Sequence, residues 1–199
     1  MSQPELEGAT PSARRIGVYV CHCGGNISDD VDVAKVVESV QGDGDVALAR
    51  TAMFACSDAS QQDMIDDIQK NQLDGLVVAS CSPKLHTYTF RAVATRAGLN
   101  PYEYSLVNIR EQCSWIHRDD HEGATAKAIG LVQAGIARTR LTEPLEQIVV
   151  ETTPKTMVIG GGTRGLRPAV GPADIGLPVV GGEPGLPPGR RAAPLRRRG

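Results

Sequence analysis

The chain has 199 residues, a formal net charge of −2 and a hydrophobic fraction of 41%. This length supports one ordinary domain, or one domain and part of a second, and the apolar fraction is high enough for a packed core. The sequence has no apolar run of about 18 residues and no secretory signal near its start, and its charge gives no reason to expect nucleic acid. We therefore expect a cytoplasmic protein with no membrane span and no nucleic-acid partner.

Apolar and amphipathic stretches alternate through the first 142 residues. The pattern predicts strands at 15–20, 45–51, 73–80 and 104–107, and helices at 32–40, 60–70, 86–97 and 122–141. Glycine is common just after the last turn of a helix, so we expect Gly98 to end the third helix. Strands that alternate with helices at this spacing favour an α/β fold, with an open parallel sheet and helices on both faces. A linker follows at 143–154, with one short strand expected at 147–150.

Five cysteines follow the predicted strands: Cys21, Cys23, Cys56, Cys81 and Cys113. An odd number in a chain without a secretory signal argues against a set of structural disulfides. Cys21 and Cys81 come directly after the first and third strands, and Cys56 and Cys113 come a few residues after the second and fourth. Because the carboxyl ends of parallel strands share one edge of the sheet, where ligands bind, we expect the sulfurs to meet there.

Thiolates that converge in this way favour an iron–sulfur cluster over zinc. Zinc ions and iron–sulfur clusters both bind soft thiolate ligands. Structural zinc sites, however, show compact C-x2-4-C pairs, which this sequence lacks. A [4Fe–4S] cluster is bulkier than one ion, so dispersed loops can reach its corners, and we predict that four of the five cysteines bind one. Alternate residues of an extended chain face opposite ways, and the glycines after Cys23 leave room, so of the first pair we favour Cys23 over Cys21. The alternative is that these cysteines are small buried hydrophobes.

The last segment opens like a dinucleotide-binding domain. A short apolar strand at 156–160 runs into GGGTRG at 160–165, which satisfies the G-x-G-x-x-G pattern for pyrophosphate binding. Glu183 follows about 20 residues later, where an acid would bind a ribose hydroxyl. The candidate dinucleotide contacts are therefore Gly160, Gly162, Gly165 and Glu183.

The helix that this motif requires is not expected. Pro168, Gly171 and Pro172 fall inside its span, and each proline costs about 3 kcal/mol in a helix interior. From Arg164 to Arg198 the chain carries seven Arg, seven Pro and two acidic residues. This local charge of +5 leaves −7 for the first 163 residues, so two unlike segments are joined. We predict that this segment by itself binds no flavin.

Three cysteine motifs resemble the A-subunit of heterodisulfide reductase: VYVCHCGGNI at 18–27, ASCSPKLH at 79–86 and NIREQCSW at 108–115. LTEPLE at 141–146 and the strand into the glycines are similar too, so the resemblance covers residues 15–163 almost continuously. It implies a cluster-binding domain followed by a thioredoxin-reductase-like FAD domain, with flavin and [4Fe–4S] clusters passing electrons for disulfide reduction. The partners it implies are other subunits of a reductase complex, and ferredoxin or hydrogenase- or dehydrogenase-type electron donors.

The resemblance also suggests how the chain divides. We expect a disordered N-terminus at 1–14, an iron–sulfur α/β domain at 15–142, a linker at 143–154, and an incomplete Rossmann-like FAD-binding segment with an Arg/Pro/Gly-rich tail at 155–199. In an intact protein the glycines of the motif and Glu183 would contact FAD. Because the tail departs from the family, we expect a truncated or frame-disturbed copy that does not turn over a disulfide alone.

Two other functions compete with this interpretation. One is a metal-free module that docks reductase subunits through the sheet edge. The other is a thiol enzyme that uses a single cysteine of low pKa near a helix N-terminus, for which Cys56 and Cys81 are the candidates.

Overall fold

The structure is a computed structural model that describes residues 14–160 and 162–182. It contains two compact units, Met1–Glu146 and Gln147–Gly199. Among the described residues, no helix combines the length and the hydrophobicity needed to cross a lipid bilayer.

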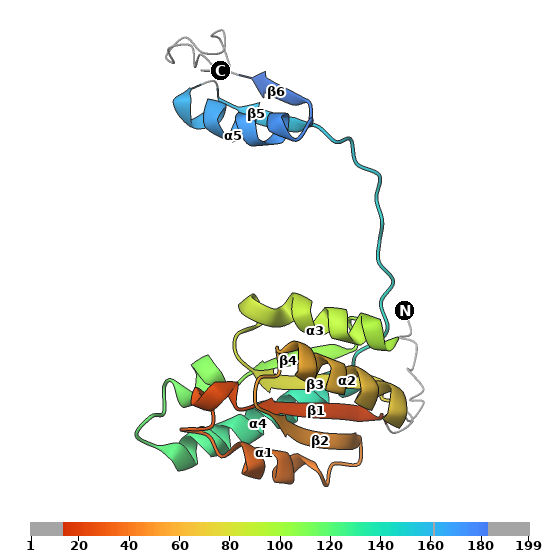
Figure 1. Ribbon diagram of the computed structural model, residues 1–199, viewed down its shortest axis with the longest axis vertical. Helices are drawn as coiled ribbons and strands as arrows, with labels where there is room; N and C mark the ends of the chain where they lie inside the picture. Colours follow the sequence, from red (N-terminus) through yellow and green to blue (C-terminus); the bar gives the residue numbers. More distant parts are fainter. Residues whose placement is uncertain (1–13, 161, 183–199) are drawn as a thin grey trace, which may run out of the picture. The chain divides into compact units, whose positions relative to one another are not determined.

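The first unit is an open parallel sheet with helices on both faces, as the sequence predicts. Its strands lie in the order β2-β1-β3-β4, with α1 and α4 on one face and α2 and α3 on the other (Figure 1). The strands are β1 (Ile16–Cys21), β2 (Val46–Ala52), β3 (Gly75–Ser80) and β4 (Tyr104–Asn108). The helices are α1 (Val33–Val40), α2 (Asp58–Asn71), α3 (Pro83–Ala97) and α4 (His121–Arg140), with short helical turns η1 (Cys23–Gly25) and η2 (Arg110–Ser114).

The two central strands explain why the sheet forms. Every residue of β1 and β3 is buried, as expected of parallel strands that are covered on both faces. Two helices begin earlier than the apolar pattern predicts because a serine caps each of them. The hydroxyl of Ser57 accepts a hydrogen bond from the backbone N–H of Ser60, and that of Ser82 accepts one from Lys84. Gly98 ends α3 at φ +85°, as predicted.

The second unit is a strand–helix–strand unit made of β5 (Thr156–Ile159), α5 (Thr163–Asp174) and β6 (Val179–Gly182). The two strands pair in parallel. The expectation that no helix follows the glycines was wrong, since α5 includes both Pro168 and Pro172. A proline removes one backbone hydrogen bond, but its φ of about −65° is itself helical, so it weakens a helix without excluding the geometry.

The strand predicted at 147–150 was also wrong. The chain forms neither helix nor strand from residue 142 to residue 155. Ile148 and Val149 are 91% and 87% exposed, so their apolar side chains have no sheet to cover. A β-branched run needs a neighbouring strand, and this segment pairs with none among the described residues.

Two glycines of α4 provide a matched test of the packing between α4 and the sheet. A Cβ on Gly135 would lie 2.5 Å from Val107 Cγ2, whereas Gly130 has no heavy atom within 4 Å of its Cβ position. Gly130→Ala should stabilise the chain by about 0.5–1 kcal/mol through helix propensity alone. Gly135→Ala should destabilise it by about 1 kcal/mol or more, because overpacking outweighs the same gain. Urea unfolding followed by the fluorescence of the single tryptophan measures both, and equal stabilisation would contradict the packing described.

Candidate cysteine site at the carboxyl edge of the sheet

Level strand ends bring four loops to one edge of the sheet. Cys21 lies opposite Ala52 at the ends of β1 and β2, and Ser80 lies opposite Asn108 at the ends of β3 and β4. The loops that carry the five cysteines therefore start at the same height. Backbone hydrogen bonds join neighbouring loops, for example from His22 N–H to the carbonyl of Ala52 at 2.8 Å.

Cys21 is buried at the centre of this edge. Its Sγ accepts hydrogen bonds from the backbone N–H of Cys23 at 3.2 Å and of Ala55 at 3.3 Å. The thiol itself lies 3.8 Å from the carbonyl oxygen of Met53. The loop after β2 is thus folded over the end of β1, and two N–H donors are already directed at the sulfur.

Cys23 occupies a backbone conformation that few non-glycine residues adopt. Its φ is +54°, and Gly24 and Gly25 follow at +62° and +100°. A non-glycine residue in this region costs of order 1–3 kcal/mol, and such strain is often found at functional sites. A Cβ on Gly24 would lie 2.6 Å from the ring of Phe54, so the close contact of these two loops also requires glycine.

Arg110 connects η2 to Cys23. Its Nη1 donates a hydrogen bond to Cys23 Sγ at 3.6 Å, and its Nη2 donates one to Glu111 Oε1 at 2.8 Å. The guanidinium carbon lies 4.8 Å from the centre of the Trp115 ring, which places the cation over the aromatic face. Burial alone would lower the pKa of Arg110, but the hydrogen bonds to Glu111 and Cys23 outweigh it and raise that pKa.

Asn26 joins the same two loops a second time. Its backbone carbonyl accepts a hydrogen bond from Ser114 Oγ at 2.9 Å, and its Oδ1 accepts one from Trp115 Nε1 at 2.6 Å. Trp115 is therefore held on η2 with its ring against Arg110, and it is 44% exposed.

The cysteines differ in burial and in the charges that act on them. Burial raises the pKa of the thiols of Cys21, Cys81 and Cys113. Cys23 and Cys56 are near enough to Cys21 and to Cys81 for their charges to raise both pKa values further, so these four form one electrostatic group.

Cys113 stands apart from that group. It is a residue of η2 whose side chain is 0% exposed in the core, and the charge that acts on it comes from Lys127 of α4. Cys56 is the exposed member of the five. Within the described part of the chain, no three His, Cys, Asp or Glu side chains are grouped as they would be around a single ion. The thiol-enzyme alternative needs a low pKa, and at Cys81 burial shifts the pKa in the opposite direction.

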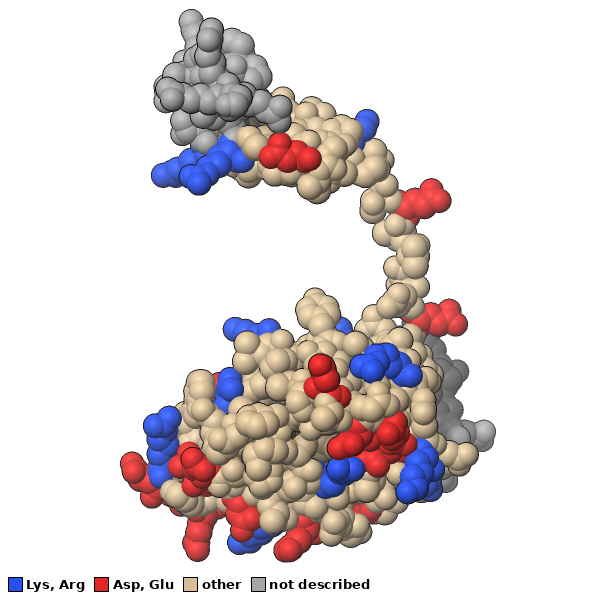
Figure 2. All heavy atoms as spheres, in the orientation of Figure 1, with Lys and Arg blue, Asp and Glu red and all other residues tan. Residues whose placement is uncertain are grey.

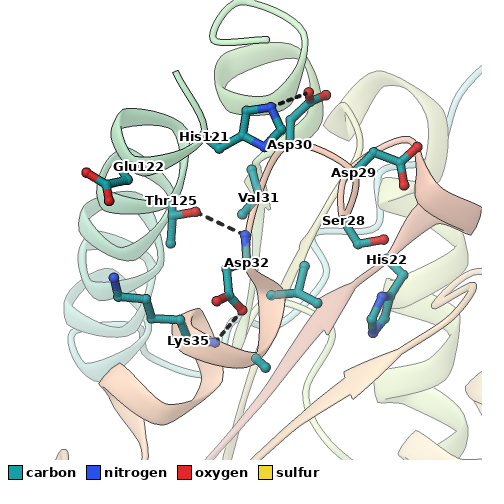
Figure 3. A pocket seen from close by; sticks show the side chains of 12 residues that line it. His22, Ser28, Asp29, Asp30, Val31, Asp32, Lys35, His121, Glu122 and Thr125 are labelled. Atoms are coloured by element: carbon teal, nitrogen blue, oxygen red, sulfur yellow. Dashed lines mark hydrogen bonds and ion pairs between the residues drawn. The ribbon is translucent and has the colours of Figure 1, made fainter. Parts of the chain in front are cut away.

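A pocket of about 560 Å³ lies beside the edge, between the start of α1 and the start of α4. His22 lines it, together with several polar side chains that already have partners (Figure 3). Asp32 caps α1 through the N–H of Lys35, and its own N–H donates to Thr125 Oγ1 at 3.0 Å.

On the face shown in Figure 2, acidic and basic side chains of the first unit are interspersed.

The glycine motif of the second unit has the strand–turn–helix setting that pyrophosphate binding requires. Gly160 has φ +108° directly after β5, and Gly162 is the N-cap of α5. A Cβ on Gly165 would overlap the carbonyl oxygen of Gly160, so only glycine fits where the helix approaches the turn. Glu183 lies outside the described residues.

Comparison with known proteins finds relatives that match most of this chain. A scan against models of protein families finds no match. The chain is 47% identical over 166 residues to the A-subunit of the Ferredoxin/F420H2-dependent CoB-CoM heterodisulfide reductase of Methanosarcina acetivorans. It is 49% identical over 166 residues to an iron-sulfur A-subunit of the CoB–CoM heterodisulfide reductase of Methanopyrus kandleri, and 40% identical over 185 residues to that of Methanocaldococcus jannaschii.

Over most of its length the chain is similar to A-subunits of heterodisulfide reductases. The matches cover 83%, 83% and 92% of this chain, in the order given, but only 21%, 25% and 28% of the relatives. The chain thus spans about a quarter of the length of these relatives. Sequence reasoning singled out the cysteines and the glycines of both units, but it did not identify Arg110, since no local pattern marks a contact between residues 87 positions apart.

Thiol labelling tests the placement of the cysteines. In the metal-free chain near pH 8, iodoacetamide should label the exposed Cys56 at least about tenfold faster than Cys21, Cys81 or Cys113, whose burial raises their pKa and blocks access. The difference between the labelling rates should become smaller as the pH rises through the raised pKa values, because the buried thiols then ionise. Mass spectrometry of peptides gives the rates, with the urea-unfolded chain as control. Equal rates in the folded chain would refute this arrangement.

Proposed function

We propose that the first unit holds one [4Fe–4S] cluster and relays electrons in a reductase complex that reduces a disulfide. The observation that carries the proposal is that level strand ends bring Cys21, Cys23, Cys56 and Cys81 to the ligand-binding edge of a parallel sheet, where Cys23 and Cys56 act on both Cys21 and Cys81. The residues suit such a cluster, because it would be held by thiolates and, being bulkier than one ion, could be reached from dispersed loops. Names of relatives support it, since the subunits from Methanopyrus and Methanocaldococcus are called iron-sulfur subunits.

Within the five cysteines we propose Cys21, Cys23, Cys56 and Cys81 as the ligands. They form the electrostatic group, whereas the charge that acts on Cys113 comes from Lys127 and not from another cysteine. The sequence favours Cys23 over Cys21 as a ligand. This proposal uses both, because both belong to the group.

The residues around these thiols have separate tasks. The N–H groups of Cys23 and Ala55 stabilise negative charge on Cys21 Sγ, as hydrogen bonds to ligand sulfurs do in iron–sulfur proteins. Phe54 and Trp115 lie at the rim, both partly exposed, and limit access of water. When bound, the cluster supplies a site that accepts and releases one electron.

For the second unit we propose the opening of an FAD-binding domain, with Gly160, Gly162 and Gly165 at the pyrophosphate and Glu183 at the ribose. The parallel β5–α5–β6 unit and the glycine turn support this assignment. For partners we propose other reductase subunits and a ferredoxin- or hydrogenase-type donor. Names of relatives support this too, since one from Methanothermobacter thermautotrophicus is called the A-subunit of an H2:CoB-CoM heterodisulfide, ferredoxin reductase.

Iron and acid-labile sulfide analysis tests the cluster and its ligands together. Protein purified anaerobically should contain about four of each per chain and show a broad absorption near 400 nm that reduction bleaches. Serine at Cys21, Cys23, Cys56 or Cys81 should abolish or deplete the iron. Cys113→Ser is the matched control and should retain it. Colourless protein with all thiols free would instead favour the metal-free docking module.

FAD retention tests the second unit. A dinucleotide-binding domain needs more strands than the two that β5 and β6 supply among the described residues, and a two-stranded unit is marginally stable. After incubation with FAD and gel filtration, the chain should therefore keep far less than one equivalent, measured by flavin absorption after denaturation. Stoichiometric retention would show that the unit is already complete enough to bind.

A further inference from the structure

Arg110 is the charged side chain with a hydrogen bond to a proposed ligand sulfur. Its Nη1 lies 3.6 Å from Cys23 Sγ, and its side chain is only 15% exposed. A hydrogen bond from a cation is stronger than one from a neutral donor, and low exposure limits the screening of the charge by water. The ring of Trp115 and the carboxylate of Glu111 hold the guanidinium in this place.

The charge of Arg110 also reaches beyond Cys23. It is the largest charge effect on the Cys81 thiol, where it lowers the pKa against the raising effects of burial, Cys23 and Glu111. Arg110 and Glu111 thus act on Cys81 with opposite signs. Their side chains are joined at 2.8 Å, but the guanidinium is the one that contacts a sulfur.

We propose that Arg110 is a positioning residue that acts through Cys23 to raise the reduction potential of the cluster, and that Glu111 moderates this effect. The inference rests on the proposed function. One-electron reduction adds a negative charge to the cluster and its thiolates. A fixed cation that donates to a ligand sulfur stabilises the reduced form more than the oxidised form, and a nearby carboxylate does the reverse.

Two substitutions should therefore shift the potential in opposite directions. Arg110→Met removes the cation and the donor and should lower the one-electron reduction equilibrium constant at least about tenfold, which corresponds to about 59 mV. Glu111→Gln keeps an amide that can bond to Arg110 but removes the negative charge, and it should raise the potential. Arg110→Lys keeps the charge, so its reduction potential should lie between that of Arg110→Met and that of the unaltered chain.

Arg91 offers a matched control. Its guanidinium carbon lies 5.2 Å from the centre of the Tyr102 ring, so it shares the stacking arrangement, but it is not among the charges that act on Cys21, Cys81 or Cys113. Arg91→Met should leave the potential unchanged. The measurement is a dithionite titration of the full chain with redox mediators, in which the reduced cluster is quantified by electron paramagnetic resonance and iron content is checked for each variant.

The outcomes separate this inference from the function on which it rests. If the unaltered chain takes up no iron, even after reconstitution, the cluster proposal fails and the role of Arg110 fails with it. If the cluster forms but Arg110→Met leaves the potential unchanged, or if the Arg110→Met and Glu111→Gln variants shift it in the same direction, only the role of Arg110 is overturned. If Arg110→Met loses the cluster, Glu111→Gln decides: a raised potential supports the inference and an unchanged one refutes it.

Discussion

Parallel pairing of two fully buried strands is the constraint on which the candidate site depends. β1 and β3 are buried along their whole length, so they occupy the middle of the sheet, with β2 and β4 on either side. Because all four strands end at the same level, the loops that follow them lie at one edge of the sheet. Cysteines that are up to 92 positions apart in the sequence thereby come to lie at the same edge.

The edge itself combines strain with compensation. Cys23 and the two glycines after it turn the chain with three consecutive positive φ angles, which is an unfavourable arrangement for a cysteine. Hydrogen bonds to Cys21 Sγ and the stacked pair of Arg110 and Trp115 hold that turn from both sides. The unfavourable backbone is thus maintained by groups that also surround the sulfurs, which is how functional sites usually differ from ordinary turns.

The sequence predicted the sheet, its helices and the edge because each depends on local patterns. Valines at helical spacing in α1 and unbroken apolar runs in β1 and β3 are readable without coordinates. The start of α3 was misplaced because Ser82 and Pro83 begin it before the apolar face does. The contact of Arg110 with Cys23 could not be predicted, because it arises from tertiary packing between two loops and not from spacing along the chain.

The two hydrogen bonds accepted by Asn26 have a consequence for how a cofactor would enter. They join the loop after β1 to the loop after β4 through Ser114 and Trp115, and none of these atoms is a sulfur. The two loops are therefore held together before any metal arrives, so their conformational entropy has already been lost during folding. The loop that carries Cys56 is joined to the end of β1 as well, through the N–H groups of His22 and Ala55, so a cluster would enter a site whose loops are already in place.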